Sequence, residues 1–181
     1  MTSSTYDGEE VLDLVDANDI VVRKISREEF DSHYYDDSVK DLNFLRASVG
    51  LVQNSRGQLW IPRRTLQKKL LPGALDFSVA EHIGTGETYE QAIVRGFKEE
   101  LNLDLNQSDL IYLGKLDPFK DSLYFCAVYV YKTDNVPDYN PEDYSGYEWM
   151  YPEEVVASVM GGQSAKTALC PCIETFIKAL D

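Results

Sequence analysis

Two adjacent carboxylates, Glu99 and Glu100, stand near the end of a segment whose apolar residues repeat at helical spacing. At 100° per residue, Glu100 falls about 20° from Ile93, on the side that a helix normally buries. A buried carboxylate must be paired, protonated or bound to a metal, and oxygen-rich acidic pairs suit Mg²⁺ or Mn²⁺. The spacing therefore favours a divalent-metal site, and the alternative is a solvated face with an ordinary Arg95–Glu99 ion pair.

A glycine, Gly96, lies on the same helix one turn before the two acids. In a helix interior, glycine costs roughly 1 kcal/mol relative to alanine, so its presence beside candidate metal ligands needs an explanation. The loop "GTGE" before the helix adds a carboxylate, Glu87, at the helix N-terminus, where backbone N–H groups favour anions. Alone, such a loop is commonly only a turn, and the chain has no Rossmann fingerprint.

The stretch "AEHIGTGETYEQAIVRGFKEELNL" resembles the Nudix box of the Nudix hydrolases, whose pattern is G-x5-E-x7-R-E-U-x-E-E-x-G-U. The residues that match in register without gaps are Glu87, Arg95, Phe97, Glu99, Glu100 and Leu103. Three positions depart from the pattern: the leading glycine is Glu81, the glutamate after the arginine is Gly96, and the final glycine is Asn102. Asparagine is still tolerated in a left-handed helix end, so the box is specific in register and partly degenerate in composition.

The resemblance implies a hydrolase in which water attacks a diphosphate that is linked to another moiety, as in a small organic or nucleoside diphosphate derivative. It implies that Glu99 and Glu100 are catalytic carboxylates that bind Mg²⁺ or Mn²⁺, because a metal would offset the diphosphate charge. It also implies that Arg95 orients a glutamate through a salt bridge and that Glu87 braces the loop.

The family places its third metal-binding carboxylate at the position of Gly96, so this box lacks one ligand. Glu81, at the end of the preceding strand, is a candidate replacement ligand for the metal. We therefore expect weak metal binding and weak hydrolysis. The alternative is a catalytically inactive Nudix-fold module that binds a ligand without turning it over.

The preceding stretch "PGALDFSVAEH" is similar to a segment found before the box in the branch related to isopentenyl-diphosphate isomerase. The stretches "EVLDLVDANDIVVRKISREE" and "RGQLWIPRRTLQKK" also resemble that branch. Isomerisation itself is disfavoured, because the position of the isomerase cysteine is Ala80 and its two downstream acids fall near Ser122 and Tyr124. His82 is retained, and we interpret it as a hydrogen-bonded structural histidine.

The segment "RRTLQKK" is the only dense positive cluster in the sequence. Its candidate diphosphate contacts are Arg63, Arg64, Lys68 and Lys69. A solvated basic loop is the equal alternative. Aromatic side chains could stack on a base, but sheet packing is the favoured interpretation for Trp60, Tyr124, Tyr129 and Tyr131.

The formal net charge of the 181-residue chain is −14, which disfavours binding to a nucleic acid backbone or to an anionic membrane. The small-molecule diphosphate is therefore the expected partner, and a homodimer is compatible with the sequence. The chain has three cysteines and no apolar run long enough to span a membrane. With an acidic N-terminus unlike a signal peptide, these features favour reduced thiols and a cytoplasmic location.

Alternating apolar residues predict two hairpins, one within "EVLDLVDANDIVVRKIS" and one in which "NSRG" joins "FLRASVGLVQN" to "QLWIPRR". Thr88 and Gln91 have capping-box spacing, which predicts a helix that continues to about Leu101. Further strands are expected in "LPGALDFSVAEHI", "DLIYLGKLD", "SLYFCAVYVYK" and "YEWM". Two more helices are expected, one from Pro152 and one from Thr167 to Leu180.

Strands and helices in this mixed order indicate an α+β fold, an α/β sandwich. The family resemblance covers roughly residues 9–150 and implies the Nudix fold, a mixed β-sheet flanked by helices. We expect residues 1–8 to be disordered and residues 9–181 to form a single Nudix domain.

Overall fold

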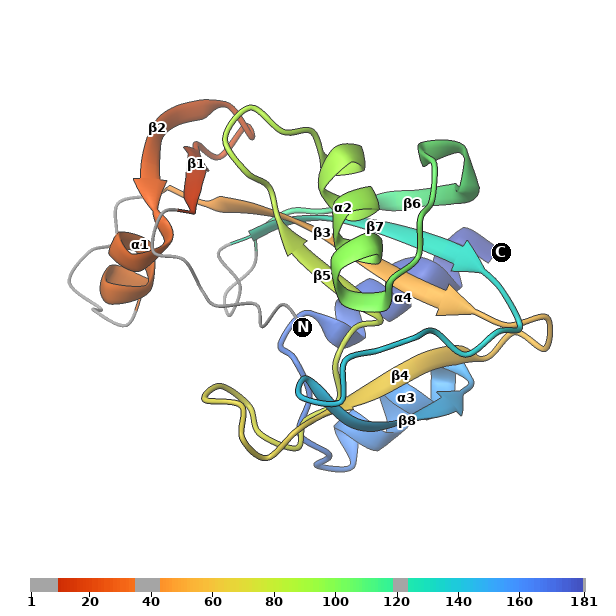
Figure 1. Ribbon diagram of the computed structural model, residues 1–181. Helices are drawn as coiled ribbons and strands as arrows, with labels where there is room; N and C mark the ends of the chain where they lie inside the picture. The colour runs from red at the N-terminus through yellow and green to blue at the C-terminus, as the bar shows by residue number, and fades with distance from the viewer. Residues whose placement is uncertain (1–9, 35–42, 119–123, 181) are drawn as a thin grey trace.

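A mixed six-stranded sheet forms the centre of the molecule (Figure 1). The computed structural model describes residues 10–34, 43–118 and 124–180, so the expectation for residues 1–8 and the position of Ser122 lie outside the described part. The path of the sheet is β6-β7-β3-β4-β8, and β5 pairs with β3 beside this path. The strands are β3 (Leu45–Gln53), β4 (Leu59–Arg64), β5 (Val79–His82), β6 (Leu110–Leu116), β7 (Tyr124–Lys132) and β8 (Tyr144–Met150).

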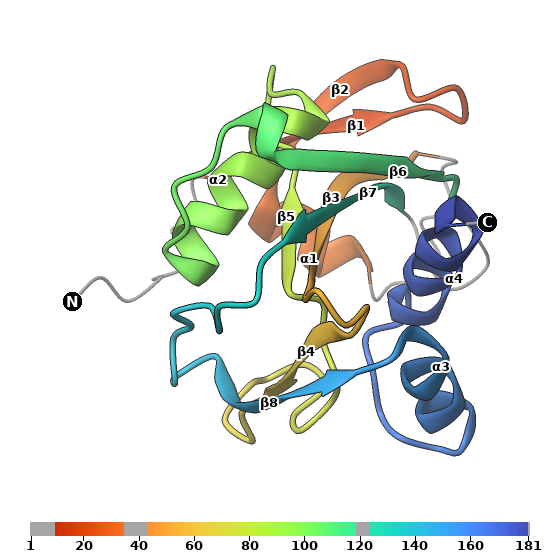
Figure 2. The ribbon, with the colours of Figure 1, turned by 90° about the vertical axis from the view of Figure 1, so that its right-hand side faces the viewer.

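Helices cover both faces of this sheet, as Figure 2 shows from the side. Helix α2 (Tyr89–Leu101) packs on one face, and α3 (Pro152–Met160) and α4 (Leu169–Leu180) pack on the other. A short 3₁₀ turn at Gln107–Asp109 connects α2 to β6. A sheet with both faces covered has near-continuous apolar strands, and six successive residues of β3 and of β7 are buried. The predicted α+β sandwich is confirmed.

The predicted hairpin of β3 and β4 is confirmed only at its turn, because the two strands pair at Gln53 and Leu59 and then diverge. Strand β3 pairs in parallel with β7 along its whole length and antiparallel with β5, and β4 pairs antiparallel with β8. Ser78 lies where they separate: its hydroxyl accepts a hydrogen bond from Val52 N at 3.0 Å and donates one to Trp60 O at 2.8 Å. The Ser78 side chain thus takes the place of backbone hydrogen bonds between β3 and β4, and β5 begins at the next residue.

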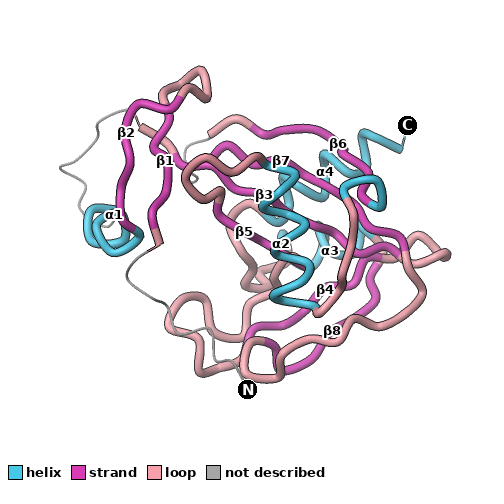
Figure 3. Tube along the Cα trace, turned by 45° about the horizontal axis from the view of Figure 1, so that its top comes forward, coloured by secondary structure: helices cyan, strands magenta, loops and turns pink. Residues whose placement is uncertain are grey.

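The first predicted hairpin is confirmed as an antiparallel pair, β1 (Val11–Val15) and β2 (Val21–Ser26), followed by α1 (Arg27–Tyr34). Figure 3 shows that this hairpin and α1 lie together at one edge of the molecule. An isolated bridge joins Leu12 to Gly84, so the hairpin holds the loop before α2 in place.

Helix α2 follows the predicted boundaries closely. Thr88 Oγ1 accepts a hydrogen bond from Gln91 N at 3.2 Å, and Gln91 Oε1 accepts one from Thr88 N at 2.9 Å, so the predicted capping box is present. The helix ends at Asn102 in the left-handed conformation, with φ of 51°. Its apolar side chains pack onto the sheet at Gly50 of β3. A Cβ atom there would lie 2.7 Å from two ring carbons of Phe97, so only glycine permits this close approach.

Two predicted strands have different lengths in the structure. Strand β5 begins only at Val79, because the preceding Leu75 makes isolated bridges to Arg63 and Ala165 instead of a continuous ladder. Strand β8 begins at Tyr144, earlier than the predicted "YEWM", because it pairs with β4 over the whole length of β4. Sequence alternation identified both strands but could not identify their partners.

All three cysteines are unpaired thiols. Cys170 and Cys172 lie in the first turn of α4, and Cys172 Sγ is 3.8 Å from Cys126 Sγ in the core. Within the described residues, no helix has both the length and the apolar character that a membrane span requires.

The contact between Gly50 and Phe97 gives a stability prediction. We expect Gly50→Ala to lower the free energy of unfolding by about 1–3 kcal/mol, because the added methyl group overpacks the α2 interface. The matched control is Gly146→Ala in β8, where a Cβ would meet no atom within 4 Å, and there we expect a change within about 0.5 kcal/mol. Urea unfolding of both variants measures the difference. Equal effects of the two substitutions would show that α2 does not need this glycine.

Candidate functional site

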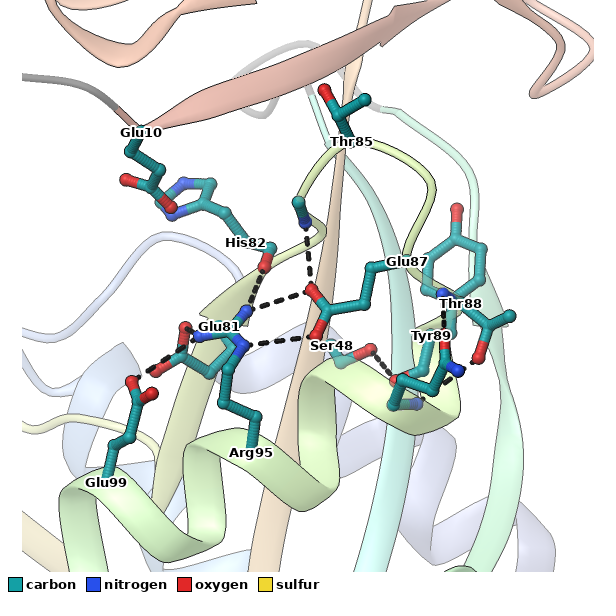
Figure 4. A network of polar contacts seen from close by, with 12 residues as sticks. Glu10, Ser48, Glu81, His82, Thr85, Glu87, Thr88, Tyr89, Arg95 and Glu99 are labelled. Atoms are coloured by element: carbon teal, nitrogen blue, oxygen red, sulfur yellow. Dashed lines mark hydrogen bonds and ion pairs between the residues drawn. The ribbon is translucent and has the colours of Figure 1, made fainter.

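Arg95 of α2 is the centre of a polar network that joins the helix to β5 and to the loop before it (Figure 4). Its Nε and Nη2 atoms donate to the two carboxylate oxygens of Glu87 at 3.1 and 3.0 Å. Nη2 also donates to His82 O at 3.0 Å, and Nη1 lies 2.8 Å from Glu81 Oε2 and 3.5 Å from Glu99 Oε2. The i,i+4 ion pair of Arg95 and Glu99 in the solvated-face alternative is present, but it is the longest of several Arg95 contacts, so that alternative describes only part of the helix surface.

Glu87 braces the loop before α2, in the place that the sequence resemblance implied. Its Oε2 atom accepts a hydrogen bond from Gly84 N at 3.0 Å in addition to its bidentate contact with Arg95. Burial alone raises the pKa of Glu87, but the hydrogen bonds from Arg95 and Gly84 outweigh it and hold the pKa below its ordinary value. Glu87 is thus a charged carboxylate that fixes both the loop and the arginine.

Gly96 is in direct contact with Glu81, the other position at which the box departs from the family pattern. A Cβ atom built on Gly96 would lie 2.3 Å from Glu81 Cγ and 2.8 Å from Val79 Cγ1. The side chain of Glu81 therefore occupies the space into which a glutamate at position 96 would extend. The two departures face each other: relative to the family pattern, the glutamate is on the strand instead of the helix, and the glycine is on the helix instead of the strand.

Glu81 and Glu100 place two carboxylates in the same confined space. Glu100 Oε1 accepts a hydrogen bond from Ala80 N at 3.1 Å, and its Oε2 accepts one from the Tyr144 hydroxyl at 3.1 Å. Burial raises the pKa of Glu81 to about 6 despite the opposing effect of Arg95. Burial and the charge of Glu81 raise the pKa of Glu100 well above its ordinary value. The predicted inward direction of Glu100 is therefore observed, and burial and proximity disfavour the simultaneous ionisation of the two carboxyl groups.

A cavity of about 270 Å³ opens beside these carboxylates. Its lining combines acidic residues from β5 and α2 with basic residues from the end of β4 and two loops. The lining residues are Arg64, Lys68, Asp76, Ala80, Glu81, Glu99, Glu100, Asn140, Asp143, Tyr144 and Lys166.

The donor chemistry of the cavity fits a divalent cation. Glu81, Glu99 and Glu100 supply carboxylate oxygens, which Mg²⁺ and Mn²⁺ prefer, and a cation would relieve the repulsion between Glu81 and Glu100. Within the described residues, however, no three His, Cys, Asp or Glu side chains are positioned to bind one metal ion together. Arg95 contacts both Glu81 and Glu99 and so competes with a cation for them.

The structure separates the four predicted diphosphate contacts into two pairs. Arg64 and Lys68 line the cavity. Arg63 instead donates to Gly73 O at 3.1 Å and to Glu148 Oε1 at 3.3 Å, and the exposed Lys69 is not part of the lining. Neighbouring residues of the basic stretch thus point in different directions, and the sequence does not reveal which of them face the cavity.

Apart from Ala80, five lining residues were not predicted from the sequence, and they are Asp76, Asn140, Asp143, Tyr144 and Lys166. They lie outside the box, and only Asp76 belongs to a stretch with a family resemblance, "PGALDFSVAEH". Lys166 reaches the cavity because its backbone N–H donates to Leu75 O at 3.0 Å, next to Asp76. Only the pairing between distant segments brings these residues together.

His82 and the aromatic residues have structural roles. Arg27 Nη1 lies 2.6 Å from His82 Nδ1, and burial together with the Arg27 charge lowers the pKa of His82 to about 3, so the ring is neutral. This agrees with its interpretation as a hydrogen-bonded histidine. Trp60 is fully buried against Tyr139, Tyr144 and Tyr147, which leaves no ring face for a ligand. Among the other rings, Tyr129 is buried in the same core cluster, against which Tyr131 packs, and Tyr124 packs against the cluster under the hairpin.

Comparison with known proteins identifies the same family as the motif. A family model described as the NUDIX domain matches residues 43–169. An uncharacterised Nudix hydrolase from Nostoc is 40% identical over 168 residues, covering 92% of this chain and 95% of the relative. A Nudix hydrolase from Deinococcus radiodurans is 39% identical, covering 91% of this chain and 92% of the relative. An isopentenyl-diphosphate Delta-isomerase from Kocuria rhizophila is 30% identical over 66% of this chain and 68% of its own.

Solved structures support the same fold. A crystal structure of a Deinococcus radiodurans protein superposes with a TM-score of 0.76 at 37% identity, covering 91% of this chain and 98% of that one. A MutT protein from Methanosarcina mazei superposes with a TM-score of 0.58 at 14% identity, covering 76% of this chain and 95% of that one, which shows likeness of fold alone.

The contact between positions 81 and 96 predicts non-additive stability. We expect Gly96→Glu alone to lower the free energy of unfolding by about 1–3 kcal/mol, because the new side chain collides with Glu81. Adding Glu81→Gly should remove most of this loss, since the double variant restores the arrangement of the family pattern. Urea unfolding of both single variants and the double variant gives the interaction free energy. Additivity within about 0.5 kcal/mol would contradict the proposed exchange of side chains.

Proposed function

Because the chain belongs to the Nudix family, we propose that it is a hydrolase that cleaves the diphosphate of a small organic or nucleoside diphosphate derivative with Mg²⁺ or Mn²⁺. One observation carries the proposal: the carboxylates of Glu81, Glu99 and Glu100 share a cavity with the basic side chains of Arg64 and Lys68. A metal–diphosphate complex needs both kinds of group, because the cation binds carboxylates and the phosphate oxygens bind cations.

The residues that would hold the metal are Glu99, Glu100 and Glu81. The bound ion would offset the diphosphate charge and polarise the phosphorus–oxygen bond. Arg95 fixes Glu81, and the Tyr144 hydroxyl and Ala80 N–H fix Glu100, so two of the three carboxylates are oriented by hydrogen bonds before a ligand arrives.

Glu81 supplies the third carboxylate, which the box lacks at position 96. Its side chain lies beside Gly96 and lines the same cavity as Glu99 and Glu100. The charge available to a cation is nevertheless reduced, because Arg95 pairs with both Glu81 and Glu99. Weak metal binding and slow hydrolysis follow from this competition rather than from the absence of a ligand.

A second candidate function is a ligand-binding module without turnover. The hydrogen bonds at Glu100 favour it, because each of its carboxylate oxygens already accepts one from the protein. Such a module would bind a diphosphate and release no product. Isomerase activity stays disfavoured, because the residue in the position of the isomerase cysteine is Ala80, which brings no reactive group to the cavity lining.

Hydrolysis can be tested with a panel of organic and nucleoside diphosphates plus Mg²⁺ or Mn²⁺, by measuring released phosphate. We expect Glu99→Gln to lower kcat/KM by about 100-fold or more, because it removes one ligand charge. The Glu99 side chain is 58% exposed, so the fold should be retained. The matched control is Glu174→Gln, an exposed glutamate on α4, which makes the same charge change outside the cavity lining. Absence of product from every substrate would exclude the hydrolase and favour the binding module.

The role of Glu81 can be tested without substrate. We expect Glu81→Gln to weaken Mn²⁺ binding by roughly tenfold, because the amide keeps the shape of the side chain but removes its charge. Electron paramagnetic resonance of free Mn²⁺ measures the affinity directly, and Glu174→Gln again serves as the control. An unchanged affinity would mean that Glu81 only replaces the bulk of the missing glutamate.

A further inference from the structure

Lys166 lines the cavity although it is far from the box in the sequence. It lies between α3 and α4, and its backbone N–H donates to Leu75 O at 3.0 Å, while Leu75 N donates to Ser164 O at 2.9 Å. These two hydrogen bonds hold the segment against the chain that leads into Asp76. The position of Lys166 is therefore set by backbone pairing and does not depend on its own side chain.

The other two basic residues of the cavity are already neutralised. Arg64 Nη1 lies 2.6 Å from Asp76 Oδ2, and Arg64 Nε donates to Leu70 O at 3.1 Å. Lys68 pairs with Asp143. Both cations thus have carboxylate partners from the cavity lining before any ligand binds.

Lys166 differs from both of them. Although five acidic residues share its cavity, its ammonium group makes no hydrogen bond or ion pair with any residue in the described part of the chain. An ammonium group has three donors and no acceptor, and it suits the charge of phosphate oxygens. The donors of Lys166 are available to a ligand in a way that those of Arg64 and Lys68 are not.

We propose that Lys166 is a substrate-binding residue that donates to the non-bridging phosphate oxygens of the diphosphate. The inference rests on the proposed diphosphate substrate and adds a residue that the box and the basic stretch "RRTLQKK" do not contain. In this arrangement the carboxylates of β5 and α2 hold the cation, and Lys166 holds the phosphate end of the same complex. Arg64 and Lys68 add positive charge but share it with Asp76 and Asp143.

A different role for Lys166 would be to balance the negative charge of the cavity. The two roles make opposite predictions for Lys166→Ala. Loss of a phosphate contact weakens the binding of a diphosphate. Loss of a balancing charge leaves diphosphate binding unchanged and tightens Mn²⁺ binding, because the cavity becomes more negative.

The test uses the full chain and methylenediphosphonate, a diphosphate analogue that cannot be hydrolysed, titrated calorimetrically in the presence of Mg²⁺. We expect Lys166→Ala to weaken its binding by roughly tenfold or more, as for loss of a charged hydrogen bond. Lys166→Arg should retain most of the affinity because it keeps the charge and donors. The matched control is Lys178→Ala on α4, an exposed lysine outside the cavity whose loss changes the net charge equally. Thermal unfolding of each variant verifies the fold.

Equal binding by Lys166→Ala and wild type overturns the inference, as does a wild-type protein that does not bind the analogue. A loss of analogue affinity in Lys166→Ala but not in Lys178→Ala supports the inference, even when no substrate of the panel is hydrolysed. In that case only the hydrolase proposal fails. If a substrate is hydrolysed, Lys166→Ala should raise KM more than it lowers kcat, whereas Lys178→Ala should change neither.

Discussion

The guanidinium group of Arg95 is the interaction on which the site depends. It binds Glu87 with two hydrogen bonds, Glu81 with one and the carbonyl of His82 with another, so a single side chain joins α2, β5 and the loop between them. Charged hydrogen bonds of this kind are stronger than neutral ones, and the bidentate contact also fixes orientation. Glu81, Glu87 and Glu99 contact this arginine directly, and Glu100 accepts a hydrogen bond from Ala80 of the strand that the arginine holds.

The second constraint is the space between α2 and β5. Helix α2 approaches the sheet closely at Gly50, and Gly96 faces Glu81 with no room for a Cβ atom. In a closely packed interior, one of two facing positions must be small when the other is large. Relative to the family pattern, glycine and glutamate are exchanged between positions 81 and 96. A carboxylate therefore still lies beside Glu99 and Glu100, but it comes from strand β5 instead of helix α2.

The charges of the cavity follow from how distant segments meet. The divergence of β3 and β4, bridged by Ser78, allows β5 to pair with β3 and places Ala80 and Glu81 against α2. The end of β4, the loop that follows it and the segment before α4 then bring basic residues to the same space. An acidic chain with a net charge of −14 thus acquires a local site in which cations and carboxylates are both available.

The sequence by itself determined the family, the α+β class, the helix from the capping box to Asn102, and the inward direction of Glu100. These features depend on local periodicity, on caps and on a fixed spacing within one helix, all of which are written in consecutive residues. It did not determine that Glu81 fills the space above Gly96, that only Arg64 and Lys68 of the basic stretch reach the cavity, or that Lys166 joins them. Those outcomes depend on packing and pairing between residues far apart in the chain, and only the tertiary structure brings them within contact distance.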